Sequence, residues 1–151
     1  LIGSRGDSIV FGGGAEGLMG ACAHGVHRTG GGIVGIAPRF FDEPGILYDK
    51  CSRMIFTETM RERKQRMQEE SDACIVLPGG IGTMEEIFEV ITLSSLGRMQ
   101  KKSAFLDAEN YWQPAVELLR GAGVDMTTAE PVSQALETFG RLLDEMEALT
   151  A

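Results

Sequence analysis

The chain has 151 residues, 43% of them hydrophobic, and a formal net charge of -8 at pH 7, which fits one globular domain over residues 1–151 with a core of its own. The acidic balance argues against nucleic acid as a partner, because binding a phosphate backbone requires a basic face. No apolar run approaches the roughly 18 residues of a membrane span, so no membrane partner is expected either.

Short apolar runs alternate with longer amphipathic ones along the chain. In order, we expect strand 8–11, helix 16–28, strand 33–37, a loop over 38–52, strand 54–57, helix 58–70, strand 73–77, helix 84–96, strand 103–106, helix 111–120 and helix 132–149. This alternation is typical of α/β proteins.

The unbroken apolar strands 33–37 and 73–77 fit positions that are buried on both faces of a sheet. We therefore predict a Rossmann-like, doubly wound parallel sheet with helices on both faces. Ligands of such sheets bind at the carboxyl ends of the strands. Two glycine-rich loops, 12–14 and 79–82, follow predicted strands and so lie at such ends.

The second glycine loop has the features of a phosphate site. Its residues are Pro78, Gly79, Gly80, Ile81, Gly82 and Thr83. Glycines let backbone N–H groups approach a ligand closely, and the following helix start contributes about half a positive charge and unpaired donors. The competing interpretation is a tight strand-to-helix turn that needs glycine for conformational reasons alone.

Two glutamates follow this loop, Glu85 and Glu86. Thr83 and Glu86 have the spacing of a capping box, in which both side chains bond to the backbone at the start of a helix. Acidic residues in a first turn also favour the helix dipole. A carboxylate beside a phosphate site, however, raises the electrostatic energy unless it takes part in the chemistry. The spacing leaves both interpretations open.

The segment 60–67 begins a helix directly after a strand and carries four basic residues in six positions. Such a run usually forms a solvated helix face. The functional interpretation is a guanidinium that grips phosphate or substrate through paired hydrogen bonds.

The first glycine loop resembles a dinucleotide-binding fingerprint only loosely, and it does not indicate NAD. His24 and His27 lie on one helix, but no further histidine or cysteine completes a metal site. Three cysteines without metal-ligand spacing favour reduced thiols and a cytoplasmic location. We expect neither a metal nor an organic cofactor.

Three segments together match one family pattern: GGGAEGLMG at 12–20, MRERKQRM at 60–67, and PGGIGTMEE at 78–86 followed by Ile91 and Thr92. With these motifs the chain resembles the Lonely Guy family, long mislabelled as lysine decarboxylases, and the resemblance runs over nearly the whole chain. Its members are phosphoribohydrolases that split a nucleoside 5'-monophosphate into free base and ribose 5-phosphate. Plant-type members prefer cytokinin nucleotides, and many bacterial relatives accept AMP.

The resemblance implies roles for individual residues. Arg63 and Glu86 correspond to the catalytic pair. The substrate-binding positions that correspond are Gly13, Gly14, Met60, Lys64, Pro78, Gly79, Gly80, Ile81, Gly82, Thr83, Glu85 and Thr92. The resemblance also implies a nucleoside 5'-monophosphate as substrate, and a homodimer with sites near its interface.

The chain departs from the family pattern in three places. The family's first strand and its glycine-serine loop would precede Leu1, so we expect an N-terminally incomplete chain. Gly45 stands where the family has a glutamate, for which Glu43 is the available substitute, and the region between Gly123 and Val132 is short. These differences bear on substrate preference more than on reaction class.

One alternative comes from another functional class. A nucleotide-binding or cofactor-carrier protein on the same fold would need the glycine loops but not the pair Arg63 and Glu86. Lysine decarboxylation is rejected, because no lysine lies in a convincing context for binding pyridoxal phosphate.

Overall fold

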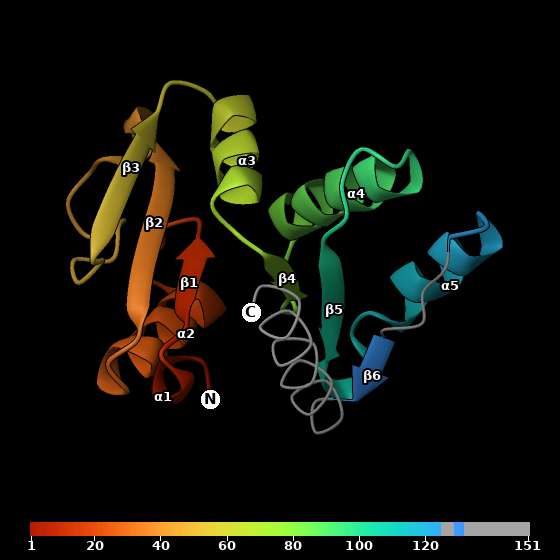
Figure 1. The fold of residues 1–151 in the computed structure, drawn as a ribbon, viewed down its shortest axis with the longest axis horizontal. Coiled ribbons are helices and arrows are strands. Elements are labelled where there is room, and N and C mark those ends of the chain that lie inside the picture. The colour runs from red at the N-terminus through yellow and green to blue at the C-terminus, as the bar shows by residue number, and fades with distance from the viewer. Residues whose placement is uncertain (125–128, 132–151) are drawn as a thin grey trace, which may run out of the picture. The chain divides into compact units, whose positions relative to one another are not determined.

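Parallel strands alternate with helices in the computed structural model, which describes residues 1–124 and 129–131 (Figure 1). The chain divides into two units, Leu1–Ser71 and Asp72–Ala151. The first contains helix α1 (Ile2–Arg5), strand β1 (Ser8–Phe11), helix α2 (Gly17–Arg28), strand β2 (Gly32–Pro38), the 3₁₀ helix η1 (Arg39–Phe41), strand β3 (Arg53–Thr57) and helix α3 (Met60–Glu69).

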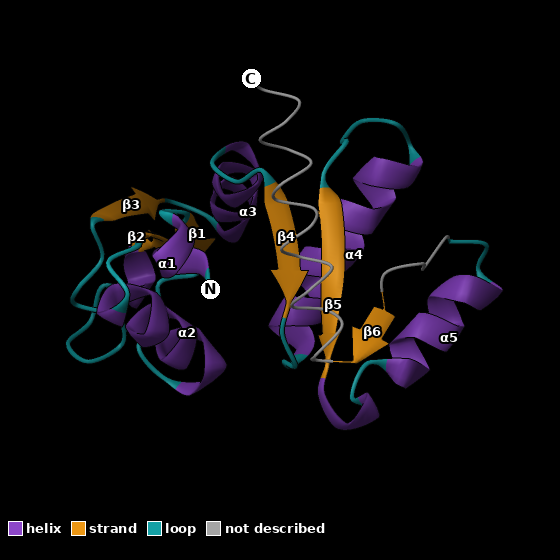
Figure 2. Cartoon of the chain, turned by 60° about the horizontal axis from the view of Figure 1, so that its bottom comes forward, coloured by secondary structure: helices purple, strands orange, loops and turns teal. Residues whose placement is uncertain are grey.

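The sheet of the first unit has the order β1-β2-β3, with all its neighbours parallel. The last residues of β2 and β3, Pro38 and Thr57, are paired, whereas β1 ends at Phe11 opposite Gly35, three residues before the end of β2. Helix α2 lies against β1 and β2 (Figures 1 and 2) and buries Ala23 and Val26 with Ile33 of β2. Strand β2 thus contributes Ile33 to the core of this unit.

The second unit begins with a short strand and a long helix. Its elements are β4 (Ala73–Val76), α4 (Ile81–Ser95), β5 (Lys102–Asp107), the 3₁₀ helix η2 (Ala108–Asn110), α5 (Gln113–Gly121) and β6 (Ala129–Pro131). The sheet order is β4-β5-β6, again parallel, with Ala73 opposite Lys102.

One hydrophobic core joins the helices of this second unit to its sheet. It comprises Val76, Ile87, Val90, Phe105, Trp112, Val116 and Leu119. Phe105 and Trp112 meet edge to face, with ring centroids 5.5 Å apart. Residues from β4, α4, β5 and α5 share this cluster, so α4 and α5 are both anchored to the strands beside which the glycine loop lies.

The predicted α/β class and its parallel strands are confirmed. Most element boundaries agree within two residues, but α4 begins three residues before the expected helix 84–96. The short elements α1 and β6 were not expected. The predicted helix 132–149 lies outside the described residues, and the interpretation as one domain stays a prediction.

Candidate active site

The first glycine loop is tied to a distant part of its own unit. Tyr48 N–H donates to the carbonyl of Gly13 at 2.8 Å, and Ala15 N–H donates to the carbonyl of Ile46 at 2.9 Å. Gly13 has a φ of 78°, which disfavours any other residue there. Gly13 and Gly14 therefore have a backbone role that is visible in the structure, and their predicted contact with substrate stays a prediction.

Arg63 is the one charged residue of helix α3 that is buried, at 7% exposure. Its Nε donates to the carbonyl of Ile36 in β2 at 3.2 Å. Its guanidinium also lies beside Gly12, where the β-carbon of any other residue would lie 3.2 Å from Cζ and closer still to Nη2. Because Gly12 directly follows β1, the guanidinium lies at the carboxyl end of that strand.

The other basic residues of α3 behave as the simpler interpretation expects. Arg61 is exposed, and Arg66 forms ion pairs with Glu69 at 3.1 Å and with Glu70 at 3.9 Å on the surface. Lys64 is half-buried and Met60, at the first helical position, is 37% exposed. The run therefore combines two exposed arginines, Arg61 and Arg66, with the half-buried Lys64 and one buried residue, Arg63.

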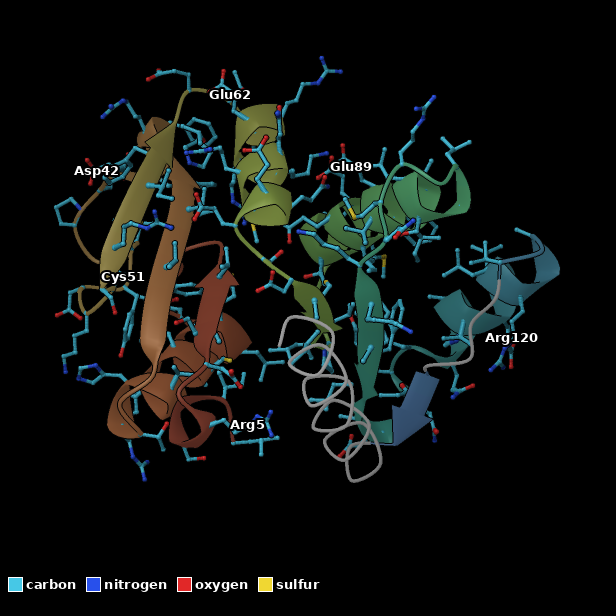
Figure 3. The ribbon with its side chains drawn as sticks, in the orientation of Figure 1. Arg5, Asp42, Cys51, Glu62, Glu89 and Arg120 are labelled. Atoms are coloured by element: carbon cyan, nitrogen blue, oxygen red, sulfur yellow. The ribbon has the colours of Figure 1, made fainter. Side chains whose placement is uncertain are left out.

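A variant of the capping box occurs at the start of α3, in which the glutamate bonds to the residue before the N-cap. The Thr59 hydroxyl oxygen accepts from Glu62 N–H at 3.1 Å, and the Glu62 carboxylate in turn accepts from Glu58 N–H at 2.9 Å. Figure 3 shows Glu62 at this end of the helix. These two bonds stabilise the turn from which Arg63 projects.

The capping-box interpretation of Thr83 and Glu86 is wrong. Helix α4 begins at Ile81 with Gly80 as its N-cap, so Thr83 is already the third helical residue and Glu86 belongs to the second turn. No acidic residue lies in the first turn. The interpretation of Glu86 as a helix cap, which the spacing left open, and the placement of Glu85 and Glu86 in the first turn are both corrected by this earlier helix start.

The glycines of the second loop differ in the atoms that a β-carbon at each position would contact. A β-carbon on Gly79 would collide with the side chain of Thr83, so this glycine serves internal packing. At Gly80 and Gly82 a β-carbon would meet no protein atom within 4 Å, and neither residue has a positive φ. No contact or backbone angle within the described protein therefore requires glycine at these two positions.

Glu86 lies within electrostatic reach of a partly buried thiol. Burial raises the pKa of Cys74, in β4, to about 11; the negative charge of Glu86 adds to the rise, and Lys101 opposes it. Glu86 itself is half-buried, whereas Glu85 is exposed. The charge of Glu86 therefore acts on a residue of β4, whereas Glu85 is exposed to solvent.

Two predicted substrate-binding residues of α4, Ile81 and Thr92, lie at different distances from the second glycine loop. Ile81 is 83% exposed at the first turn of α4. Thr92 is on the same helix, and nine residues at about 1.5 Å each separate it from Thr83 by roughly 14 Å. Its hydroxyl bonds to the carbonyl of Phe88 at 2.7 Å. Within the second unit, Thr92 is therefore not brought to the glycine loop.

The structure adds a residue that the sequence did not single out. The hydroxyl of Tyr111 donates to the carbonyl of Gly79 at 2.7 Å, across 32 positions of the chain. Tyr111 follows β5, next to β4 in the sheet. Its place just after the carboxyl end of a predicted strand was the only signal in the sequence.

The described residues contain no group of three metal-binding side chains, and His24 and His27 are both exposed. Cys22, Cys51 and Cys74 are free thiols. Across residues 1–124 and 129–131, no helix has the length and the apolar character that crossing a bilayer demands.

Comparison with solved structures supports the fold. A molybdenum cofactor binding protein from the phototrophic bacterium Rippkaea orientalis superposes with a TM-score of 0.70, covering 94% of this chain and 81% of that one. At 18% sequence identity, this likeness shows a shared fold alone.

Sequence comparison is more specific. A family model described as possible lysine decarboxylase matches residues 19–150. The probable cytokinin riboside 5'-monophosphate phosphoribohydrolase LOGL1 of Oryza sativa subsp. japonica is 37% identical over 150 residues, which are 97% of this chain and 67% of the relative.

Two further relatives carry the same enzyme name. LOG5 of Arabidopsis thaliana is 40% identical over 105 residues, covering 70% of this chain and 46% of the relative. The enzyme of Rhodococcoides fascians is 37% identical over 118 residues, covering 78% of this chain and 60% of its own. The chain therefore belongs to the Lonely Guy family of cytokinin riboside 5'-monophosphate phosphoribohydrolases, the family whose model bears the lysine decarboxylase description.

Proposed function

We propose that this protein hydrolyses the N-glycosidic bond of a nucleoside 5'-monophosphate, releasing the free base and ribose 5-phosphate. The observation that carries the proposal is the pair Gly80 and Gly82. Neither is required by a contact or a backbone angle of the described protein, and both lie at the start of a 15-residue helix. The relatives at 37–40% identity are named for this reaction.

The glycine loop holds the 5'-phosphate in this proposal. Unpaired N–H groups at the start of α4 and the helix dipole both favour an anion. Open space over Gly80 and Gly82 lets phosphate oxygens approach the backbone. Because the phosphate is remote from the bond that breaks, its binding energy positions the ribose for reaction.

Glu86 supplies the carboxylate for the chemical step. As the bond between C1' and the base nitrogen breaks, its electron pair leaves with the base and positive charge develops on the ribose. A carboxylate stabilises that charge, or orients the water whose oxygen forms the new bond to C1'. The water's protons end on the new hydroxyl group and on the departing base, so no redox partner is needed.

Arg63 binds the nucleotide and assists the departing base by hydrogen bonding. Its burial and its bond to Ile36 hold the guanidinium in one orientation, which suits directional bonds. We propose both Arg63 and Glu86 as catalytic residues because both belong to the family pattern, and the family match spans both residues. Met60, Lys64, Gly13, Gly14, Glu85 and Thr92 complete the proposed substrate contacts.

We also propose a homodimer, with sites near its interface. Helix α4 exposes apolar side chains that a partner would cover, and its C-cap adds another: Ile81 at 83%, Phe88 at 37% and Leu96 at 66%. Light scattering of the wild type and of Phe88→Glu tests this, since a dimer through α4 should dissociate in the variant.

We also propose a cytoplasmic location, because the three cysteines are free thiols.

The test is a substrate panel of AMP, GMP, CMP and isopentenyladenosine monophosphate, with free base and ribose 5-phosphate both quantified. We expect equimolar products from at least one purine nucleotide, and loss of turnover in Glu86→Gln. Binding of these nucleotides without product would instead indicate a carrier. That alternative is not favoured, because the structural relative that binds a cofactor shares the fold alone.

A further inference from the structure

Tyr111 reaches back to the phosphate loop from the connection between β5 and α5. Its hydroxyl donates to the carbonyl of Gly79 at 2.7 Å. Strands β4 and β5 are parallel neighbours, with Val76 opposite Phe105, so both connections leave the same edge of this sheet. The contact therefore joins two loops at the carboxyl edge where ligands of α/β sheets bind.

The connection between β5 and Tyr111 contains two non-glycine residues in an unfavourable backbone conformation. Glu109 and Asn110 have φ angles of 53° and 60°, both in the left-handed region that non-glycine residues rarely adopt. Buried Asp107 closes the turn by accepting from Trp112 N–H at 2.7 Å and from the Gln113 side chain at 2.8 Å.

The aromatic ring of Tyr111 is fixed independently of its hydroxyl. It meets the fully buried Trp112 edge to face, with centroids 5.1 Å apart. The position of the hydroxyl is thus set by the β5–α5 connection. The bond between Tyr111 and Gly79 is exposed to solvent, where water could serve the carbonyl, so satisfying a buried acceptor does not explain the contact.

The physical consequence concerns the next N–H group. The Gly79 carbonyl and the Gly80 N–H belong to one planar peptide unit and point in opposite directions. Gly80 has no neighbour near its β-carbon position and has the backbone freedom of glycine. A hydrogen bond to the Gly79 carbonyl therefore restricts the orientation of this peptide.

We propose that Tyr111 is a positioning residue: by holding the Gly79 carbonyl, it points the Gly80 N–H toward the 5'-phosphate. This inference rests on the proposed function, since it names how the phosphate loop is preorganised. Tyr111 acts through the backbone and takes no part in breaking the bond. Its loss should therefore weaken binding equally in the ground state and the transition state.

The experiment compares the wild type with Tyr111→Phe, which keeps the ring and its contact with Trp112. We expect the KM for the preferred nucleotide to rise about fivefold to tenfold with kcat unchanged, since one hydrogen bond is lost. The Kd for ribose 5-phosphate, measured by calorimetry, should rise by the same factor. Cleavage of the matching nucleoside, which lacks the phosphate, should not change.

A second measurement does not depend on turnover. The amide resonance of Gly80 should shift or broaden in Tyr111→Phe, while that of Gly121, at the end of α5, should stay in place. A Gly80 resonance, KM and ribose 5-phosphate Kd all within error of the wild type would overturn the proposal. So would a lowered Tm with equal losses for nucleotide and nucleoside, which would make the role structural.

Failure of the proposed function would look different. If the wild type releases base from no nucleotide, the hydrolase assignment fails, yet the Gly80 resonance still shows whether Tyr111 orients the peptide. The wild type and Tyr111→Phe are expressed, purified and assayed in parallel, so a difference in KM or in the resonance does not reflect the preparation.

Discussion

The guanidinium of Arg63 occupies the space beside Gly12 that a β-carbon there would need. One residue directly follows β1 and the other projects from α3, 51 positions later in the sequence. The absence of a side chain at residue 12 is therefore what allows a buried arginine at the end of β1. We expect the two positions to be functionally coupled.

Gly12→Ala tests this coupling. The added methyl group should displace the guanidinium, and a misplacement of about 1 Å costs roughly 100-fold in rate when a group must be aligned with substrate. We expect kcat/KM for the nucleotide to fall by about that factor while circular dichroism stays native. Gly25→Ala is the matched control, because a β-carbon added at Gly25, on helix α2, meets no atom within 4 Å. Equal activity of the two variants would contradict the coupling.

The second glycine loop allows a separation of binding from stability. Because a β-carbon at Gly80 or Gly82 meets no protein atom, alanine should be tolerated there, and at Gly82 should stabilise the helix by up to about 1 kcal/mol. Phosphate affinity should nevertheless fall roughly tenfold in both variants, the equivalent of about one charge-assisted hydrogen bond. Urea unfolding and ribose 5-phosphate titration give the two quantities. A destabilised variant with unchanged affinity would show that the glycines serve the fold.

Removing the charge of Glu86 should affect the chemical step. Loss of a catalytic carboxylate typically costs 10²–10⁴-fold, so we expect Glu86→Gln to lower kcat about 1,000-fold with a KM near the wild-type value. Glu117→Gln is the matched control, because Glu117 is exposed on α5. Single-turnover measurements separate chemistry from product release. A variant with wild-type kcat would eliminate Glu86 from the mechanism.

The Thr59 side-chain cap at the start of α3 should contribute measurably to stability. Thr59→Ala removes the acceptor of Glu62 N–H, and such a loss costs about 1 kcal/mol. Thr59→Ser keeps the hydroxyl and should recover most of that free energy of unfolding. Urea titration at pH 7 measures both variants. If alanine and serine behave alike, the side chain of Thr59 does not cap the helix.

The raised pKa of Cys74 predicts a loss of stability in alkaline solution. The folded thiol has a pKa of about 11, above the ordinary 9.0, so the folded state binds more protons than the unfolded state between these values. Stability should then fall as pH rises from about 9 to 11, by up to about 3 kcal/mol. Cys74→Ala should show a flatter profile of unfolding free energy across that interval.

The same thiol reports on Glu86. Because the negative charge of Glu86 contributes to the rise after burial, Glu86→Gln should lower the pKa of Cys74, though burial keeps it above the ordinary value. Thiolate formation as a function of pH, followed by ultraviolet absorbance in Cys22→Ser/Cys51→Ser protein, measures this. An unchanged titration curve would place Glu86 farther from β4 than the structure does.

The sequence by itself determined the alternation of strands and helices, the position of both glycine loops and the family. These follow from local patterns: apolar periodicity, glycine clusters and short motifs act over a few residues. The prediction of Thr83 as the N-cap of α4 was wrong, because Gly80 is also an acceptable N-cap and the local pattern does not distinguish the two. The same limit left Glu86 open as a cap.

Only the tertiary structure decided which side chains of a pattern become buried. Four basic residues on α3 look alike in sequence, yet packing against β2 buries Arg63 alone. Likewise, Tyr111 reached Gly79 only because β4 and β5 are neighbours and a left-handed turn follows β5. Such contacts depend on strand order and chain reversal over tens of residues, which no local pattern encodes.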